Sequence, residues 1–193
     1  MNDDDQIIFK IAISNFKEKN YEGAEKNFLI LLKEYPKNIN LLKNLSLSYF
    51  HNQKFLEAET TIKKILELNY KDKEIIEFLI LCLKKQDKGL EILKIIKSYS
   101  NIINPKYNLL SKYERPQIPE NVYEIDFIRK RTLNEINNLT SNENIDLKVD
   151  ENFLDPPLFS YSYDNKDNLI LAKKFHELFT NCYPELRQNI FIK

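Results

Sequence analysis

The chain has 193 residues, of which 42% are apolar and 30% are charged, the proportions of an ordinary soluble globular protein. Its 29 Lys and Arg residues are balanced by 29 Asp and Glu residues. No excess of charge would attract a nucleic acid or an anionic membrane surface, so we expect neither as a partner.

Three apolar triplets recur along the first half of the chain with one fixed spacing. They are Ala24, Phe28 and Leu31; Ala58, Ile62 and Ile65; and Ile92, Ile96 and Tyr99. The equal steps from 24 to 58 to 92 match the period of the tetratricopeptide helical hairpin, about 34 residues. We call this step the repeat period. Because such a hairpin cannot bury its apolar face alone and stacks on its neighbours, the spacing predicts an all-α solenoid of about three repeats.

We place the repeats at residues 5–38, 39–72 and 73–104, each a pair of helices joined by a short turn. Ala24 and Ala58 are small, which lets the two helices of a hairpin approach closely where they cross. The third repeat is degenerate, because Ile92 occupies the small-residue position and Gly89 weakens the start of its second helix.

The pattern stops after residue 104. Residues 105–119 contain three prolines and are predicted to be an extended linker. Residues 120–193 are predicted to form a mainly helical segment with extended arms. Its elements are a helix at about 120–139, an extended stretch at 153–163, a helix at about 167–182 and a strand start at 189–193. The first of these helices carries on one face Val122, Ile125, Ile128, Ile136 and Leu139. Because a chain ending inside a strand leaves backbone groups unpaired, we expect a piece of a longer protein.

Two segments of this second half resemble a known family. They are Glu114 to Pro119 (ERPQIP) and, after the next helix, Pro156 to Asn168 (PPLFSYSYDNKDN). Segments similar to these lie between tetratricopeptide repeats and the catalytic domain in bacterial proteins of the O-linked N-acetylglucosamine transferase group, the SPINDLY-like family 41 glycosyltransferases. That group commonly carries P-P-F-x-L-x-Y-x-x-x-N-D/N there, which Pro156, Pro157, Phe159, Tyr163 and Asp167-Asn168 resemble.

The resemblance implies that this chain is the non-catalytic part that precedes a pair of nucleotide-sugar-binding domains. In the family those domains supply a glycine-containing first strand, a catalytic histidine and a lysine near the diphosphate. None of these elements can be placed on residues 1–193, so we assign no catalytic residue.

Side chains that could carry chemistry are few and scattered. Gly23 and Gly89 stand singly, whereas a phosphate loop needs clustered glycines. His51 and His176 have no neighbour in sequence suited to a general-base pair. The run Asp3-Asp4-Asp5 is typical of a solvated terminus. We expect no cofactor and no metal.

The compartment is indicated by the amino terminus and the cysteines. Met1 to Gln6 is acidic where a signal peptide would be basic, and no apolar run approaches the roughly 20 residues needed to span a bilayer. Cys82 and Cys182 lie far apart in sequence, each in an apolar stripe, as buried, reduced thiols do. A cytoplasmic protein is predicted.

By the repeat register, the first helix of each hairpin lines the concave surface of the solenoid. The residues of this predicted groove are Phe9, Lys10, Ile13, Lys43, Asn44, Leu47, Glu77, Phe78 and Leu81. A clamp for a carboxylate tail needs converging donors, and only Lys10, Lys43 and Asn44 could contribute, while Glu77 would oppose them. The transferase group often lines this surface with asparagines that hold a peptide, and Asn44 is the only one here.

What remains in the groove is apolar, and such a surface fits an amphipathic helix. Either residues 120–139 of the same chain or a partner could supply it. The predicted function is a protein-interaction scaffold, the amino-terminal part of a cytoplasmic glycosyltransferase, which binds a protein or its own downstream catalytic domain and does not transfer sugar itself. The alternatives are a free-standing adaptor whose groove is the whole activity and, third, a co-chaperone.

Overall fold

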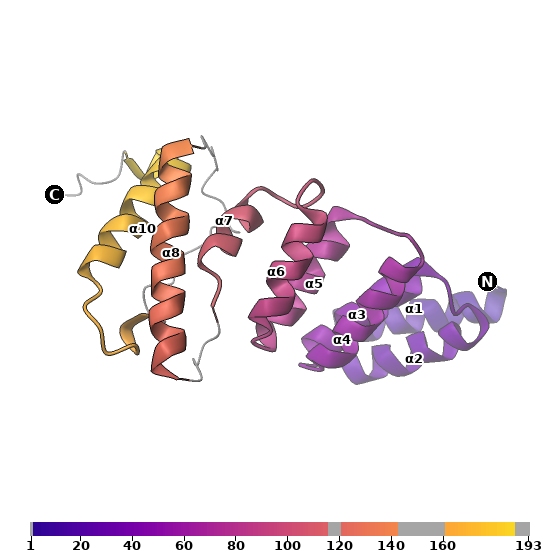
Figure 1. Ribbon diagram of the computed structural model, residues 1–193. Coiled ribbons are helices and arrows are strands. Elements are labelled where there is room, and N and C mark those ends of the chain that lie inside the picture. The colour runs from indigo at the N-terminus through magenta and orange to yellow at the C-terminus, as the bar shows by residue number, and fades with distance from the viewer. Residues whose placement is uncertain (1, 116–120, 143–160, 188–193) are drawn as a thin grey trace. The chain divides into compact units, whose positions relative to one another are not determined.

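The computed structural model describes residues 2–115, 121–142 and 161–187 (Figure 1). Within these ranges every regular element is a helix, so the all-α prediction is confirmed for them. The chain divides into two compact units, Met1–Ile95 and Ile96–Lys193. The division falls inside a helix, somewhat before the boundary at residue 104 that the repeat pattern predicts.

The first unit is built from consecutive helices in pairs. They are α1 (Asp3–Lys17) and α2 (Tyr21–Glu34), α3 (Ile39–His51) and α4 (Phe55–Glu67), then α5 (Lys73–Lys85) and α6 (Gly89–Tyr99), the last of which crosses the division between units. From α1 to α5 each helix packs against the next one along the chain.

The turns of these pairs repeat at the same spacing as the apolar residues. Lys19, Gln53 and Asp87, which follow α1, α3 and α5, all adopt left-handed backbone conformations with φ of 62°, 60° and 56°. The first helices of the second and third pairs begin after Asn38 and Asp72, whose side chains accept a hydrogen bond from the backbone of the first turn. Each of these positions lies one repeat period from its equivalent (19 to 53 to 87, and 38 to 72).

The core of the first unit sits where the helices cross. Ala24 and Ala58 have no exposed surface, as expected for small residues at a close approach. Ala24 and Phe28 of α2 lie in one cluster with Leu41 and Leu45 of α3. The face of α3 that carries these two leucines is therefore buried by the preceding hairpin.

The second unit contains α7 (Lys106–Tyr113), α8 (Val122–Asn142), α10 (Leu169–Cys182) and the short 3-10 helix η1 (Pro184–Arg187). Helix α8 packs against both α7 and α10, and α8 and α10 lie side by side in Figure 1. Aromatic rings join α7 to α10, with the ring centroids of Tyr113 and Phe175 5.5 Å apart. The predicted helices at 120–139 and 167–182 correspond to α8 and α10.

Two predictions for the second half are wrong in part. The linker predicted at 105–119 contains α7, because Pro105 stands directly before the helix, where it breaks no hydrogen bond, and Leu109, Leu110 and Tyr113 give the helix a buried face. In the stretch predicted to be extended, Tyr161 and Ser162 are helical. Residues 153–160 of that stretch and the strand start at 189–193 lie outside the described residues.

Candidate functional site

The predicted groove residues lie on the first helix of each pair in the first unit: Phe9, Lys10 and Ile13 on α1; Lys43, Asn44 and Leu47 on α3; Glu77, Phe78 and Leu81 on α5. All of them are at least partly exposed. Three equivalent positions, each one repeat period from the next, are aliphatic: Ile13, Leu47 and Leu81, of which Leu81 is 41% exposed. We call these three the aliphatic row.

The polar groove residues are largely engaged within the scaffold. Lys43 Nζ donates to Tyr70 Oη at 3.1 Å, lies 3.4 Å from Asp72 Oδ2, and stands 4.5 Å from the centre of the Tyr70 ring. Partial burial lowers the pKa of Lys43, but the hydrogen bonds to Tyr70 and Asp72 outweigh it and raise the pKa overall. Asn44 donates its amide to Asn40 O in the same helix. A carboxylate clamp built on Lys43 and Asn44 is therefore poorly supported.

The aromatic groove residues also serve the scaffold. The ring of Phe9 packs edge-on to Phe28 of α2 at 6.1 Å, and Phe78 packs edge-on to Phe50 of α3 at 5.2 Å. Both rings are half-buried. Within the aliphatic row, Ile13 is partly buried and packs against the same core as Phe9, whereas Leu81 is exposed.

A buried glutamate links the first hairpin to the second. Glu25 of α2 is 5% exposed and accepts hydrogen bonds from Asn52 Nδ2 at 2.9 Å and Lys54 Nζ at 2.6 Å, both in the turn between α3 and α4. The carboxylate thus fixes the turn of the following hairpin. We call this arrangement a glutamate clamp.

The same clamp recurs one repeat period later. Glu59 of α4 is 3% exposed and accepts hydrogen bonds from Gln86 Nε2 at 2.9 Å and Lys88 Nζ at 2.7 Å. Lys63 of the same helix also donates to it. Sequence reasoning missed both clamps, although the repeated Ala-Glu pairs and the lysines at 54 and 88 share the repeat period. Position 93 is a leucine, so the series has no third carboxylate.

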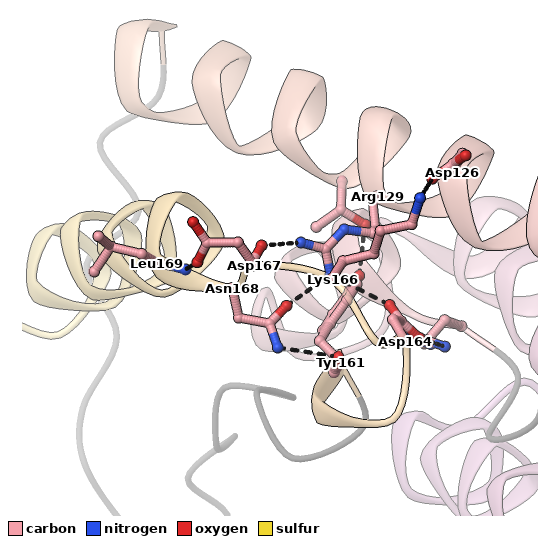
Figure 2. Close-up of polar contacts among 10 residues, drawn as sticks. Asp126, Arg129, Tyr161, Asp164, Lys166, Asp167, Asn168 and Leu169 are labelled. Carbon is pink, nitrogen blue, oxygen red and sulfur yellow. Dashed lines mark hydrogen bonds and ion pairs between the residues drawn. The ribbon is translucent and has the colours of Figure 1, made fainter.

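The second unit holds a different cluster, centred on one buried carboxylate. Arg115 donates through Nη1 and Nη2 to Asp164 Oδ2 and Oδ1 at 3.0 and 2.9 Å, and the two side chains are 4% and 1% exposed. Arg129 of α8 approaches the same carboxylate at 3.4 Å (Figure 2). The Arg115 guanidinium lies 4.5 Å from the centre of the Tyr161 ring.

Other contacts fix Tyr161 and the start of α10. The Tyr161 hydroxyl is 2.8 Å from Thr132 Oγ1 of α8, and Asn168 donates to Tyr161 O at 3.1 Å. Arg129 donates to Asn168 Oδ1 and to Asp167 O, each at 2.6 Å (Figure 2). Burial raises the pKa of Tyr161, against the lowering effect of the Thr132 hydrogen bond and the nearby arginines.

This arginine cluster is suited to holding the fold rather than to catalysis. Arginines are few among the 29 basic residues of the chain, yet three of them belong to this cluster. Arg115 and Arg129 pair with Asp164, and the charge of Arg131 lowers the pKa of Tyr161. A guanidinium can bind a carboxylate with two parallel hydrogen bonds, which a lysine cannot do. Because Asp164 and Arg115 are both buried and paired, the geometry presents neither to a substrate.

His51 and the two cysteines, which were further candidates for chemistry, are packed against other side chains or buried. His51 stacks on Tyr21 at 5.1 Å and meets Phe16 edge-on at 5.5 Å. Cys82 and Cys182 are both buried, and burial raises the pKa of Cys82 to about 12. In the described ranges no three His, Cys, Asp or Glu side chains gather as a metal site would require.

Among the helices that the structure describes, none combines the length and the apolar character needed to cross a membrane.

Comparison of the sequence with protein-family models and with curated proteins finds no match to either.

Proposed function

We propose that the first unit is a tetratricopeptide-type stack of helical hairpins that serves as a protein-interaction scaffold. The proposal is supported by independent features that share the repeat period: the small residues at 24 and 58, the left-handed turn residues at 19, 53 and 87, and the glutamate clamps. Such stacks carry no chemistry of their own and present an extended surface for binding.

The single observation that carries the binding site is the aliphatic row. Ile13, Leu47 and Leu81 repeat at equivalent positions, the first two partly exposed and the third exposed, whereas the leucines at 45 and 79 on the same helices are buried. An accessible apolar row on successive helices fits a partner segment that presents apolar side chains at helical spacing. Lys10 is exposed beside the row and would contact the polar edge of that segment.

A partner is favoured over a helix from the same chain. The helix predicted for that role is α8, whose residues Ile128, Ile136 and Leu139 are 4% exposed or less while α8 packs against α7 and α10 of its own unit. Val122, on the same predicted face, is 60% exposed. The apolar face of α8 is thus largely occupied within the second unit.

We further propose, from the resemblance given above, that the chain is the amino-terminal part of a cytoplasmic glycosyltransferase and orients an acceptor or the downstream catalytic domain. Supporting this, residues of the two resembling segments meet in one buried cluster, since Arg115 pairs with Asp164 and Asn168 bonds Tyr161. A free-standing adaptor is the second candidate, favoured because the aliphatic row can bind a partner without any further domain.

The binding site is tested with peptides selected on the wild-type chain from a displayed library of helical peptides. Fluorescence anisotropy should show that Leu81→Asp weakens binding by about tenfold or more, because a charge would be desolvated against apolar side chains. Ile30→Asp is the matched control, since Ile30 is 48% exposed but lies on α2. Equal losses in the two variants would contradict the proposal.

The transferase and the adaptor differ in what the gene encodes after codon 193. About 300 further codons with an α/β pattern and a glycine-bearing strand-to-helix turn would support the transferase. A stop codon followed by unrelated sequence would support the adaptor. In either case this chain alone should not bind a uridine or guanosine diphosphate sugar, and measurable binding would contradict its assignment as non-catalytic.

A further inference from the structure

Helix α1 carries an exposed apolar face whose counterparts in the next two hairpins are buried. Ile7 and Ile11 are 55% and 48% exposed. Their equivalents one repeat period later, Leu41 and Leu45, are 1% and 3% exposed, and those a further period on, Ile75 and Leu79, are 5% and 0% exposed. We call the exposed surface around Ile7 and Ile11 the end face.

The structure shows what covers the equivalent faces. Leu41 and Leu45 of α3 lie in a cluster with residues of the preceding helix, α2. In the same way α5, which carries Ile75 and Leu79, packs against the helix before it, α4. In each case the cover is an amphipathic helix, the second helix of the preceding hairpin. The end face has the residue types and spacing to accept such a helix, because Ile7 and Ile11 are neighbours on one side of α1.

Acidic residues lie at both ends of the end face. Asp3 and Asp4 lie at one end of it by helical spacing and Glu18 lies at the other, where Ser14 donates to the Glu18 carboxylate at 2.8 Å. All three acidic residues are exposed. The lysines of α1, at 10 and 17, lie on the side toward Ile13, and Lys10, three residues after Ile7, borders the end face.

The clamp positions are altered as well. A glutamate on the covering helix is held at the later turns by Asn52 with Lys54, and by Gln86 with Lys88. One repeat period before Asn52 and Lys54, the equivalent positions hold Glu18 and Asn20. A helix that carried a glutamate there would meet a like charge, whereas a lysine or an arginine would be attracted.

We propose that the end face binds an amphipathic helix of a partner protein, with an apolar centre and basic residues at both ends. A second copy of this chain docked through the same face is disfavoured, because either orientation of two α1 helices sets Asp3, Asp4 or Glu18 against a carboxylate of the other copy. The end face is separate from the aliphatic row, which lies on another side of α1, so this proposal does not rest on the groove.

The test uses a synthetic, fluorescently labelled helical peptide with leucines at every third or fourth position and lysines in its first and last turns. We expect saturable binding to the full chain that weakens as salt is raised. The double variant Ile7→Ser and Ile11→Ser should bind about tenfold more weakly or worse. The charge variant Asp3→Asn, Asp4→Asn and Glu18→Gln should bind several-fold more weakly and lose most of the salt dependence.

Matched controls separate this site from the other exposed surfaces. Ile30→Ser removes a side chain as exposed as Ile11 from α2 and should leave binding unchanged. A peptide with glutamates in place of the lysines should bind at least about tenfold more weakly. Melting by circular dichroism establishes that each variant is folded.

Three results would overturn the proposal. The first is binding that survives the double isoleucine substitution, and the second is equal binding of the acidic and basic peptides. The third is concentration-dependent dimerisation in analytical ultracentrifugation that the double substitution abolishes, because it would assign the end face to a second copy.

Discussion

The glutamate clamp at Glu59 can be tested by replacing its carboxylate with an amide of the same shape. Burial raises the pKa of Glu59, but hydrogen bonds from Lys63, Lys88 and Gln86 outweigh it and lower the pKa from 4.5 to about 2. That difference corresponds to about 3 kcal/mol of stability, an upper bound because Lys63 is partly exposed. Glu59→Gln should therefore lower the free energy of unfolding by about 2–3 kcal/mol at neutral pH.

The sign of the pH dependence follows from the direction of the shift. A carboxyl whose pKa is lower in the folded state stabilises the protein fully above its unfolded pKa of 4.5 and loses that stabilisation as the pH falls toward about 2. By about pH 3 the difference between wild type and Glu59→Gln should have fallen to less than about half its neutral value. Urea unfolding followed by far-UV circular dichroism at several pH values measures this difference.

Glu91→Gln is the matched control, because Glu91 pairs with the same Lys63 at 3.4 Å but its side chain is 44% exposed. It should cost about 0.5 kcal/mol or less. A buried, charged clamp at Glu59 is contradicted if Glu59→Gln costs no more than Glu91→Gln at neutral pH, or if its cost stays the same as the pH is lowered to about 3.

Further substitutions test the packing, the turns and the arginine cluster. Ala58→Leu should overpack the helix crossing and lower the free energy of unfolding by about 1–3 kcal/mol; an unchanged melting temperature would show that the crossing is not tight. Gln53→Val should lower the free energy of unfolding by about 1–2 kcal/mol, because a β-branched residue resists the left-handed conformation. Gln53→Gly should leave it unchanged, and equal effects of the two variants in urea unfolding would contradict the turn geometry. Arg115→Met should lower the free energy of unfolding by about 3 kcal/mol, because it removes the main partner of buried Asp164. Lys166→Met, at an exposed ion pair, should lower it by about 0.5 kcal/mol or less. Equal losses of stability in calorimetry would contradict a stabilising role of the buried ion pair.

The helices of the first unit could be predicted from the sequence because burial there obeys a simple period. No more than 1% of the surface is exposed at Ala24, Phe28 and Leu31 and at their counterparts at 58, 62 and 65. The groove residues were placed by the same register, and all lie on the expected helices. Register could not show that Lys43 is held by Tyr70 and Asp72, since the equivalent positions 9 and 77 are a phenylalanine and a glutamate.

In the second half local patterns competed, and tertiary packing decided between them. Prolines at 105, 116 and 119 suggested a linker, but Leu109 and Leu110 bury a helix that begins directly after the first of them. Serines alternating with aromatic residues suggested an extended stretch, yet Tyr161 is helical and fully buried while Tyr163 is 72% exposed. The cluster around Asp164 joins positions 49 apart in sequence, for which a single sequence gives no local signal.

The most direct test of the scaffold assignment is a methyl NMR titration of the isotope-labelled chain with a peptide selected on its surface. We expect the methyl signals of Ile13, Leu47 and Leu81 to shift together and to saturate at one peptide per chain, while those of Ile30 stay in place. Shifts confined to the second unit, or spread over both units without those three residues, would contradict the assignment of the repeated hairpins as the binding surface.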